Sequence, residues 1–307
     1  MTRPGIAALT LIILAIAAPF ATRADAAGTS TYLSLGDSTA FGAISTPPTP
    51  GLGDQGFVRT FADDLGHMAA GVRPAVVNAA VPFESLNTFF SGNPYNNANT
   101  NYSSPQVSQN TLFVQTVAAQ MAAGRSIDQV SISLGTMDVM NLLNSTGFAA
   151  LPLDQQAVKL GQTLGQIQGE YANVLGEVHA LLPNAKISLI GAFNPFHALP
   201  NDPIAPIAEP AFLGLNKIIQ GAAKGLGANY IDTYTAFLGH EATYTHVLDR
   251  PGDINLTAVG FTSVAAELNA AAVPEPGTLA LGCLGVLGLV ARARTLRRRG
   301  VDAASAG

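Results

Sequence analysis

The sequence predicts a single α/β domain in which a parallel sheet lies between two layers of helices. Two observations predict this class. Short apolar strand-like runs alternate with longer segments in which apolar residues recur every three or four positions. The chain also contains no internal repeat and no sign of a second domain within residues 27–272. Strands that are separated by helices pair in parallel, and the helices then cover both faces of the sheet.

The expected elements follow one another along residues 27–272. Strands are predicted at residues 31–35, 75–80, 129–134, 186–192 and 230–232. Helices are predicted at residues 56–68, 111–123, 154–182, 211–225 and 257–271, the last one capped by Asn255 or Thr257. Residues 91–110 are rich in asparagine and serine, which predicts an exposed loop.

Residues 1–26 have the layout of an export signal. Arg3 supplies a positive end, residues 6–20 are almost all apolar, and residues 24–26 (Ala-Asp-Ala) form a small-residue cleavage site. The apolar stretch is short for a membrane span. We therefore expect the mature chain to begin near Ala27.

A second signal occupies residues 273–300, and residues 301–307 are expected to be a disordered end. A Pro-Glu-Pro sequence at 274–276 precedes 15 apolar or small residues at 277–291. As a helix this stretch is about 22 Å long, against about 30 Å for a hydrocarbon core. The arginines that follow would hold the tail on the cytoplasmic side; they are Arg292, Arg294, Arg297, Arg298 and Arg299.

This layout resembles the PEP-CTERM sorting signal of Gram-negative bacteria. The resemblance implies processing by an exosortase, with inner-membrane contact through the tail before processing. It also implies delivery to the periplasm and cell envelope or to the extracellular matrix. An ordinary tail anchor is the alternative interpretation.

The body between the two signals is acidic. Residues 27–272 hold 8 Lys+Arg against 17 Asp+Glu, a net charge of −9. This balance argues against nucleic-acid binding. The only cysteine, Cys283, lies in the tail, so the domain has no disulfide. No spacing of His, Cys, Asp or Glu is typical of a metal site, and no cofactor is expected.

Candidate functional positions follow the predicted strands. Ser38 comes directly after the first strand, Phe83 after the second and Met137 after the third, while Asn255 precedes the last helix. Because the carboxyl ends of parallel strands meet at one edge of a sheet, these four residues are expected on one rim.

The motifs around these positions resemble the conserved blocks of the SGNH hydrolases, the GDSL lipase and esterase superfamily. Residues 36–38 (GDS) match the nucleophile block. The second block, "NAAVPFES", has Phe83 where the glycine belongs, and the third, "GTMD", has Met137 in place of asparagine. In the last block, "GDINLTAVG", Asn255 stands at the histidine position.

The resemblance implies a three-layer α/β/α sandwich with a parallel, flavodoxin-like sheet, the SGNH hydrolase fold. It also implies that Ser38 holds the nucleophile position and Asn255 the base position, with oxyanion donors from Ser38, Phe83 and Met137. A serine hydroxyl needs an adjacent base, and an amide has no useful basicity. Met137 offers no side-chain donor, and the ring of Phe83 would roof the acyl pocket. We therefore expect an exported protein that is catalytically impaired or inactive and binds an extracellular polysaccharide or ester ligand.

The alternative is an active serine ester hydrolase, of esterase, lipase or carbohydrate esterase type, with a relocated histidine base. His246 is the candidate because it precedes Asp249 by three residues in the loop before the last block, and His240 lies in the same loop. His197, after the fourth strand, is a weaker candidate. His67 and His179 fall on predicted helices, where surface or capping roles are expected.

Two further questions concern side chains around the rim. Glu84 and Asp138 are expected either to face the rim as a carboxylate pair or to anchor backbone N–H groups of the loops. Phe83, Phe89 and Phe90, with the tyrosines of residues 91–110, are a weaker candidate for a sugar-stacking surface.

Overall fold

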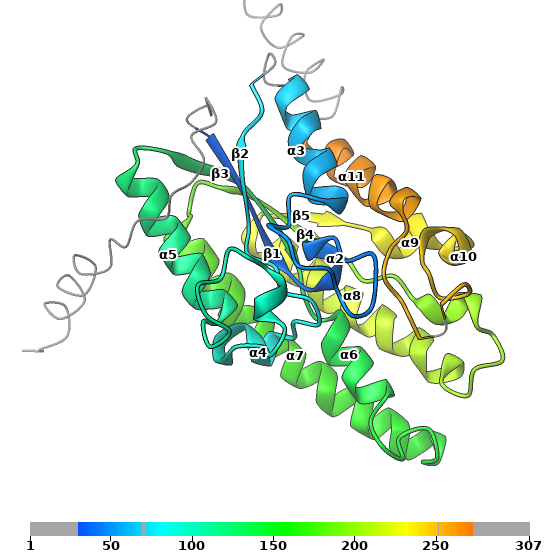
Figure 1. Ribbon diagram of the computed structural model, residues 1–307. Helices are drawn as coiled ribbons and strands as arrows, with labels where there is room; N and C mark the ends of the chain where they lie inside the picture. Colours follow the sequence, from blue (N-terminus) through cyan, green and yellow to red (C-terminus); the bar gives the residue numbers. More distant parts are fainter. Residues whose placement is uncertain (1–29, 69–71, 251, 273–307) are drawn as a thin grey trace, which may run out of the picture. The chain divides into compact units, whose positions relative to one another are not determined.

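The computed structural model of the chain describes residues 30–68, 72–250 and 252–272. They contain a five-stranded parallel sheet with the strand order β2-β1-β3-β4-β5 (Figure 1). The strands are β1 (Ser30–Gly36), β2 (Ala75–Asn78), β3 (Ser126–Ser133), β4 (Lys186–Ile190) and β5 (Asn229–Ile231). This order is the flavodoxin-like one, so the predicted fold class is confirmed.

The strands are separated by helices and two short 3₁₀ turns. The first half of the domain contains α2 (Ser38–Phe41), α3 (Gly56–Met68), α4 (Leu86–Ser91), η1 (Asn96–Ala98), α5 (Gln109–Ala122) and α6 (Thr136–Leu143). The second half contains α7 (Leu153–Leu181), η2 (Pro195–Ala198), α8 (Ala205–Leu226), α9 (Thr233–Phe237), α10 (Glu241–Tyr244) and α11 (Ala258–Ala272).

Strand β1 shows how the two helix layers arise. Successive side chains of a strand point to opposite faces of the sheet. The Thr31 hydroxyl donates to Gln120 of α5 at 3.1 Å, whereas the next residue, Tyr32, packs its ring against Phe61 of α3 with centroids 5.3 Å apart. In Figure 1, α5, α7 and α8 accordingly cover one face of the sheet, and α3 and α11 the other.

The larger core lies under α5, α7 and α8. Leu33 and Leu35 of β1 are fully buried there, together with Phe113 of α5 and Phe212 of α8. Each Å² of apolar surface removed from water stabilises the folded state by about 25 cal/mol. Such aliphatic and aromatic packing therefore stabilises a domain that has no disulfide.

The prediction of an exposed loop at residues 91–110 is wrong, because much of this segment is buried. Asn93, Asn96 and Asn99 are almost wholly inaccessible. The amide of Asn99 donates to the backbone oxygens of Asn78 and Ala80, at 2.9 and 2.8 Å. Carboxamides can satisfy the buried backbone carbonyls of an irregular segment, so asparagine here stabilises a packed loop.

The ends of several elements also differ from the predictions. Helix α8 begins at Ala205, before Pro210, and not at residue 211. Pro206 lies in the first turn, where the N–H groups have no partner within the helix, whereas Pro210 lies inside the helix, so a proline does not mark the start of this helix. Helix α6 was not among the predicted elements, which place no helix between residues 134 and 154.

No helix in the described part of the chain has both the length and the hydropathy needed to cross a membrane. The predicted export signal (1–26) and tail (273–307) lie outside the described residues.

Candidate active site

The turn that presents Ser38 begins at the end of β1. Gly36 has a φ of 140°, and a Cβ there would lie 2.2 Å from the carbonyl oxygen of Ser133 in β3. Only glycine allows this close approach of the two strand ends. The side chain of Gln109 in α5 forms two hydrogen bonds with the backbone of the same residue. It accepts from Gly36 N at 2.7 Å and donates to Gly36 O at 2.8 Å.

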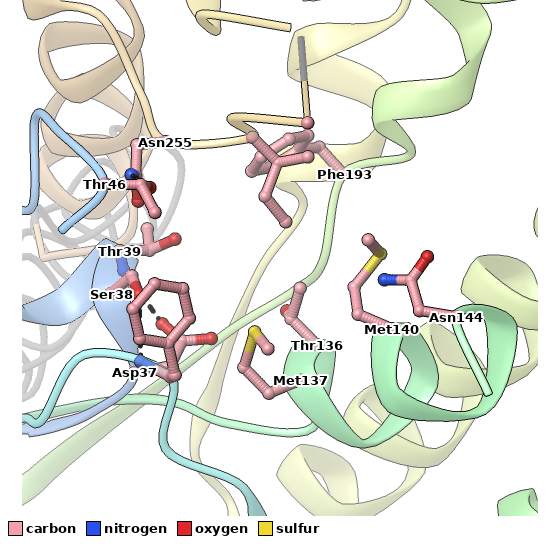
Figure 2. A pocket seen from close by; sticks show the side chains of 13 residues that line it. Asp37, Ser38, Thr39, Thr46, Thr136, Met137, Met140, Asn144, Phe193 and Asn255 are labelled. Carbon is pink, nitrogen blue, oxygen red and sulfur yellow. Dashed lines mark hydrogen bonds between the residues drawn. The ribbon is translucent and has the colours of Figure 1, made fainter. Parts of the chain in front are cut away.

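Asp37 and Ser38 have different roles in this turn. Asp37 is the N-cap of α2, and its carboxylate accepts from Thr39 N at 3.0 Å and from the Ser133 hydroxyl at 3.1 Å. Ser38, the first residue of the helix, lines a pocket (Figure 2). The aspartate therefore holds the turn, and the side chain of Ser38 faces the pocket.

The hydroxyl of Ser38 is already engaged by the backbone of the second block. Phe83 N donates to Ser38 Oγ at 3.0 Å. This N–H is the group that the family resemblance assigns to the oxyanion site, and here it contacts the serine itself. The ring of Phe83 lines the pocket and packs on Tyr95 with centroids 4.8 Å apart.

Phe83 adopts a backbone conformation that suits glycine. Its φ is 60°, and it is the one non-glycine residue with positive φ in the described part of the chain. The left-handed region costs an ordinary L-residue about 1–2 kcal/mol. The backbone at this position thus keeps a glycine-like geometry although the side chain is aromatic.

This geometry predicts an unusual order of stability at position 83. Phe83→Gly is expected to be about 1 kcal/mol more stable than Phe83→Ala, because both lose the ring but only glycine relieves the backbone strain. Urea unfolding checks the difference. Alanine and glycine variants of Asn87, which is exposed on α4, serve as the control. At this ordinary helical position the alanine variant is expected to be the more stable of the two. An alanine variant at least as stable as the glycine variant would show that residue 83 is not left-handed.

Met137 and Met140 form the wall opposite Ser38. They lie three residues apart in the first turns of α6, and Figure 2 shows both thioethers projecting from this helix toward the pocket. Gly135 precedes the helix with a φ of 99°, and a Cβ there would lie 2.7 Å from Leu215 Cδ1. Where the resemblance would place an amide donor, the structure therefore places an apolar and polarisable surface.

Asn255 lines the same pocket but does not bond Ser38. Its Nδ2 donates to the hydroxyl of Thr46 at 3.1 Å (Figure 2). Its backbone N donates to the carboxylate of Asp253 at 2.9 Å. Only 7% of Asn255 is exposed. The residue at the base position thus holds the segment that contains Thr46 and forms no hydrogen bond with Ser38.

The histidines lie apart from Ser38. His246 pairs its Nδ1 with the carboxylate of Asp249 at 3.0 Å, and its backbone N donates to Asn255 O at 3.0 Å. It is therefore next to the predicted base position, yet it is not among the residues that line the pocket. His240 stacks on Tyr244 with centroids 5.0 Å apart. No hydrogen bond joins Ser38 to a histidine in the described residues, which include all five.

His197 has a structural role, because both of its ring nitrogens contact carboxylates. Its Nδ1 lies 2.7 Å from Glu241 of α10, and its Nε2 lies 2.6 Å from Glu209 of α8. Burial alone would lower the pKa of His197, but the two carboxylates outweigh it and raise that pKa. The imidazole therefore joins η2 to both helices. His67 and His179 are exposed on α3 and α7, as expected.

Three carboxyl groups have raised pKa values in this region: Asp37, which lines the pocket, Glu84, which is fully buried, and Asp138, which is half-buried. Burial raises the pKa of Asp37 to about 6 and those of Glu84 and Asp138 to about 7. Asp138 accepts from Leu86 N at 3.0 Å, which is the anchoring role considered from the sequence. Glu84 accepts from the Gln109 amide at 3.2 Å through Oε2, while its Oε1 is buried without a hydrogen-bond partner.

The pocket has a volume of about 140 Å³ and two kinds of lining. Its apolar side chains are Phe83, Met137, Met140, Phe193 and Ile254. Its polar side chains are Asp37, Ser38, Thr39, Thr46, Thr136, Asn144 and Asn255. Ser38, Phe83, Met137 and Asn255 therefore meet in one pocket. The described residues contain no cluster of three or more His, Cys, Asp or Glu that could hold a metal ion.

Several lining residues were not identified from the sequence. Met140 and Asn144 lie on the unpredicted helix α6, where the three-residue spacing from Met137 is a signal that could have found Met140. Thr46 and Phe193 lie in connecting segments, and nothing in the local pattern of residues marks them as neighbours of Ser38.

Comparisons with known proteins agree with this arrangement. The sequence matches the GDSL-like Lipase/Acylhydrolase family over residues 34–262 and the PEP-CTERM protein-sorting motif over residues 272–298. The sorting motif implies export to the cell envelope and processing by an exosortase. No curated protein matches the chain.

Solved structures with the same fold are similar at low sequence identity. A lipase from a goat rumen metagenome has a TM-score of 0.54 at 18% identity, covering 78% of this chain and 96% of its own. An extracellular lipase from Streptomyces rimosus has a TM-score of 0.52 at 16% identity, with coverage of 79% and 99%. An acetylxylan esterase from Geobacillus stearothermophilus has a TM-score of 0.50 at 15% identity, with coverage of 79% and 93%. From the family match over residues 34–262, we conclude that this chain belongs to the GDSL-like lipase/acylhydrolase family.

Proposed function

We propose that this protein is an exported ligand-binding member of its family in which ester hydrolysis is impaired. One observation supports this most strongly: Ser38 faces the pocket, but its hydroxyl accepts a hydrogen bond from Phe83 N, and none of the lining residues is a histidine. A serine without a base is a poor nucleophile. Loss of one triad member typically costs on the order of 10⁴- to 10⁶-fold in rate.

The proposed ligand is an ester group or an extracellular polysaccharide. The pocket is lined by side chains that can bind such groups, because hydroxyls, amides and apolar side chains all face it. The exposed ring of Tyr95 lies against Phe83 and extends the apolar side, which suits an acyl chain or the face of a sugar. Polymers in the envelope or the extracellular matrix would reach this pocket once the protein is exported.

A second candidate is an active ester hydrolase that uses His246 as its base. The observation that favours it is the pairing of His246 Nδ1 with Asp249, which leaves Nε2 able to act as a base. The backbone bond between His246 and Asn255 places this pair beside the predicted base position. A change in the conformation of this loop would be needed to bring the imidazole to Ser38.

Hydrolysis of short activated esters distinguishes the two candidates. Impaired catalysis predicts that the unmodified chain is no faster than its Ser38→Ala variant. A relocated base predicts a Ser38-dependent rate that His246→Ala or His240→Ala abolishes, while His179→Ala, an exposed position on α7, leaves it unchanged. Any such rate would overturn the proposal of impaired catalysis.

We also propose that the mature protein loses both ends on export, with transient anchoring in the inner membrane through its tail. Intact mass spectrometry of protein from the native envelope or medium is expected to give a mass that begins near Ala27 and lacks the arginines at 297–299. A majority of molecules that retain Met1 or these arginines would contradict it.

A further inference from the structure

His197 lies between two carboxylates that belong to different helices. Its Nδ1 is 2.7 Å from Glu241 of α10, and its Nε2 is 2.6 Å from Glu209 of α8. A neutral imidazole has one N–H and one lone pair, so it can donate to only one of the two carboxylates. Its other nitrogen would then face a carboxylate oxygen with no proton between them. The arrangement therefore requires the imidazolium, which donates from both nitrogens.

The two carboxylates depend on this imidazolium to different degrees. Glu209 also accepts from the amide of Asn194 and from the hydroxyl of Tyr234, whose ring meets the imidazole edge-on. Its side chain is 42% exposed, whereas that of Glu241 is 4% exposed. In the described part of the chain, His197 is the one group that hydrogen-bonds the Glu241 carboxylate or pairs with its charge. Loss of the proton would thus leave Glu209 hydrated but Glu241 as a buried charge without a counter-ion, which is strongly unfavourable.

Helix α10, which begins at Glu241, is joined to a segment of the pocket wall. The backbone N of His246 donates to Asn255 O at 3.0 Å, and the backbone N of Thr257 donates to Tyr244 O at 2.9 Å. These bonds connect the end of α10 to the residues around Asn255, which lines the pocket (Figure 2). A movement of α10 would therefore move this segment as well.

A second part of the wall contacts the same helix. Phe193, four residues before His197, lines the pocket (Figure 2) and stacks on Phe237 with ring centroids 4.8 Å apart. Phe237 in turn meets the ring of Tyr244, the last residue of α10, at 5.0 Å. The positions of both Phe193 and the Asn255 segment therefore depend on where α10 lies.

We infer that His197 and Glu241 are positioning residues whose shared proton controls this wall of the pocket. With the imidazolium present, the ion pair holds α10 and the Asn255 segment in place. Without it, α10 moves until water reaches the Glu241 carboxylate, and the wall becomes mobile.

The direction of the pH dependence follows from the surroundings of His197. Burial alone would lower its pKa, but Glu241 and Glu209 outweigh burial and raise it. The wall is therefore held below this raised pKa and is released as the pH rises through it. The pocket of the exported protein would be closed in acidic surroundings and more open in alkaline ones.

Hydrogen exchange measures the mobility of this wall without any ligand. Exchange of the full chain is followed by mass spectrometry at about pH 6 and about pH 9, to cover the titration of a histidine with a raised pKa. Each rate is corrected for the intrinsic pH dependence of exchange. Protection of residues 241–257, which include the amides of His246 and Thr257, is expected to fall at least about tenfold at the higher pH.

Two substitutions are expected to fix the wall in opposite states. Glu241→Gln removes the buried charge, and its amide can donate to a neutral imidazole, so protection at the higher pH should stay within about threefold of that at the lower pH. His197→Gln leaves Glu241 without a cation, so protection at the lower pH should already equal that of the unmodified chain at the higher pH. His179→Gln, exposed on α7, is the control and should behave as the unmodified chain.

The two variants separate this role from a merely structural one. Loss of protection at both pH values in both variants would show that the contacts only support the fold, and would overturn the inference. Equal protection of the unmodified chain at the two pH values would also overturn it. So would a fall that persists in Glu241→Gln, because Asp37, Glu84 or Asp138 would then be responsible. If His197→Gln does not fold, Glu241→Gln still decides, and neither result depends on whether Ser38 is activated.

Discussion

The triple variant Phe83→Gly/Met137→Asn/Asn255→His is expected to hydrolyse short activated esters at least about 10³-fold faster than the unmodified chain. The histidine restores the kind of group whose loss typically costs on the order of 10⁴- to 10⁶-fold. The asparagine restores an oxyanion donor worth roughly 10²- to 10³-fold. The glycine removes the ring that lines the pocket and keeps the φ of 60° without strain. Incomplete alignment of the new groups explains why the expected gain is smaller than the combined losses.

Single restorations are expected to do little. Asn255→His alone loses the hydrogen bond to Thr46 and still faces Met137 and the ring of Phe83. Initial rates with an activated acetate ester, with Ser38→Ala added to the triple variant as control, measure the effect. A gain that survives Ser38→Ala, or a triple variant no faster than the unmodified chain, would contradict the assignment of these positions.

The free energy of unfolding is expected to fall as the pH rises from about 4 to about 7. The pKa values of Asp37, Glu84 and Asp138 are raised in the folded chain, from 3.8 to about 6, from 4.5 to about 7 and from 3.8 to about 7. In this range the folded state binds more protons than the unfolded state, so each rise in pH favours unfolding. A shift of two units in a single buried carboxyl corresponds to about 3 kcal/mol.

Glu84→Gln isolates one of these groups. At pH 8 this variant is expected to be about 2 kcal/mol more stable than the unmodified chain, because an uncharged amide replaces a carboxylate that has one oxygen buried without a partner. At pH 4 the two should be nearly equal. Glu177→Gln, at a half-buried position on α7, is the control. Urea unfolding at both pH values measures the difference, and equal stability of the Glu84 variant and the unmodified chain at pH 8 would contradict the proposed burial.

His197 contributes to the same trend through a different mechanism. Its pKa is raised because the attraction of Glu241 and Glu209 exceeds the effect of burial. The stabilisation is therefore present below the unfolded pKa of about 6.5 and is lost as the pH rises through the folded value. His197→Gln should weaken the pH dependence above about pH 6.5 but leave the part due to the carboxyls.

Local patterns were sufficient for the elements with strong periodicity. Helix α3 has the predicted bounds, and β1 was found because its alternating residues end at a glycine turn. The family-like framework also placed Ser38, Phe83, Met137 and Asn255 on one rim, and these four residues do line one pocket. Sequence spacing carries this information because the order of strands and helices fixes which strand ends meet.

Other features depend on contacts between distant segments. The hydrogen bonds of Gln109 to Gly36, and of Asn255 to Thr46, join residues that no local pattern connects. The asparagine-rich segment has the composition of a solvated loop, yet Asn99 is buried because backbone carbonyls of the second strand need donors. Only the resemblance, which places a glycine at position 83, gives a sign of the left-handed backbone of Phe83, because the phenylalanine itself gives none.

Whether Ser38 is activated is the central question, and covalent labelling answers it most directly. A fluorophosphonate ester reacts with serines whose proton is removed by a neighbouring base, independently of the natural ligand. Intact mass spectrometry after incubation with this probe is expected to show no adduct on the unmodified chain and a Ser38 adduct on the triple variant. A stoichiometric adduct on Ser38 of the unmodified chain would contradict impaired catalysis and show that a base reaches this serine.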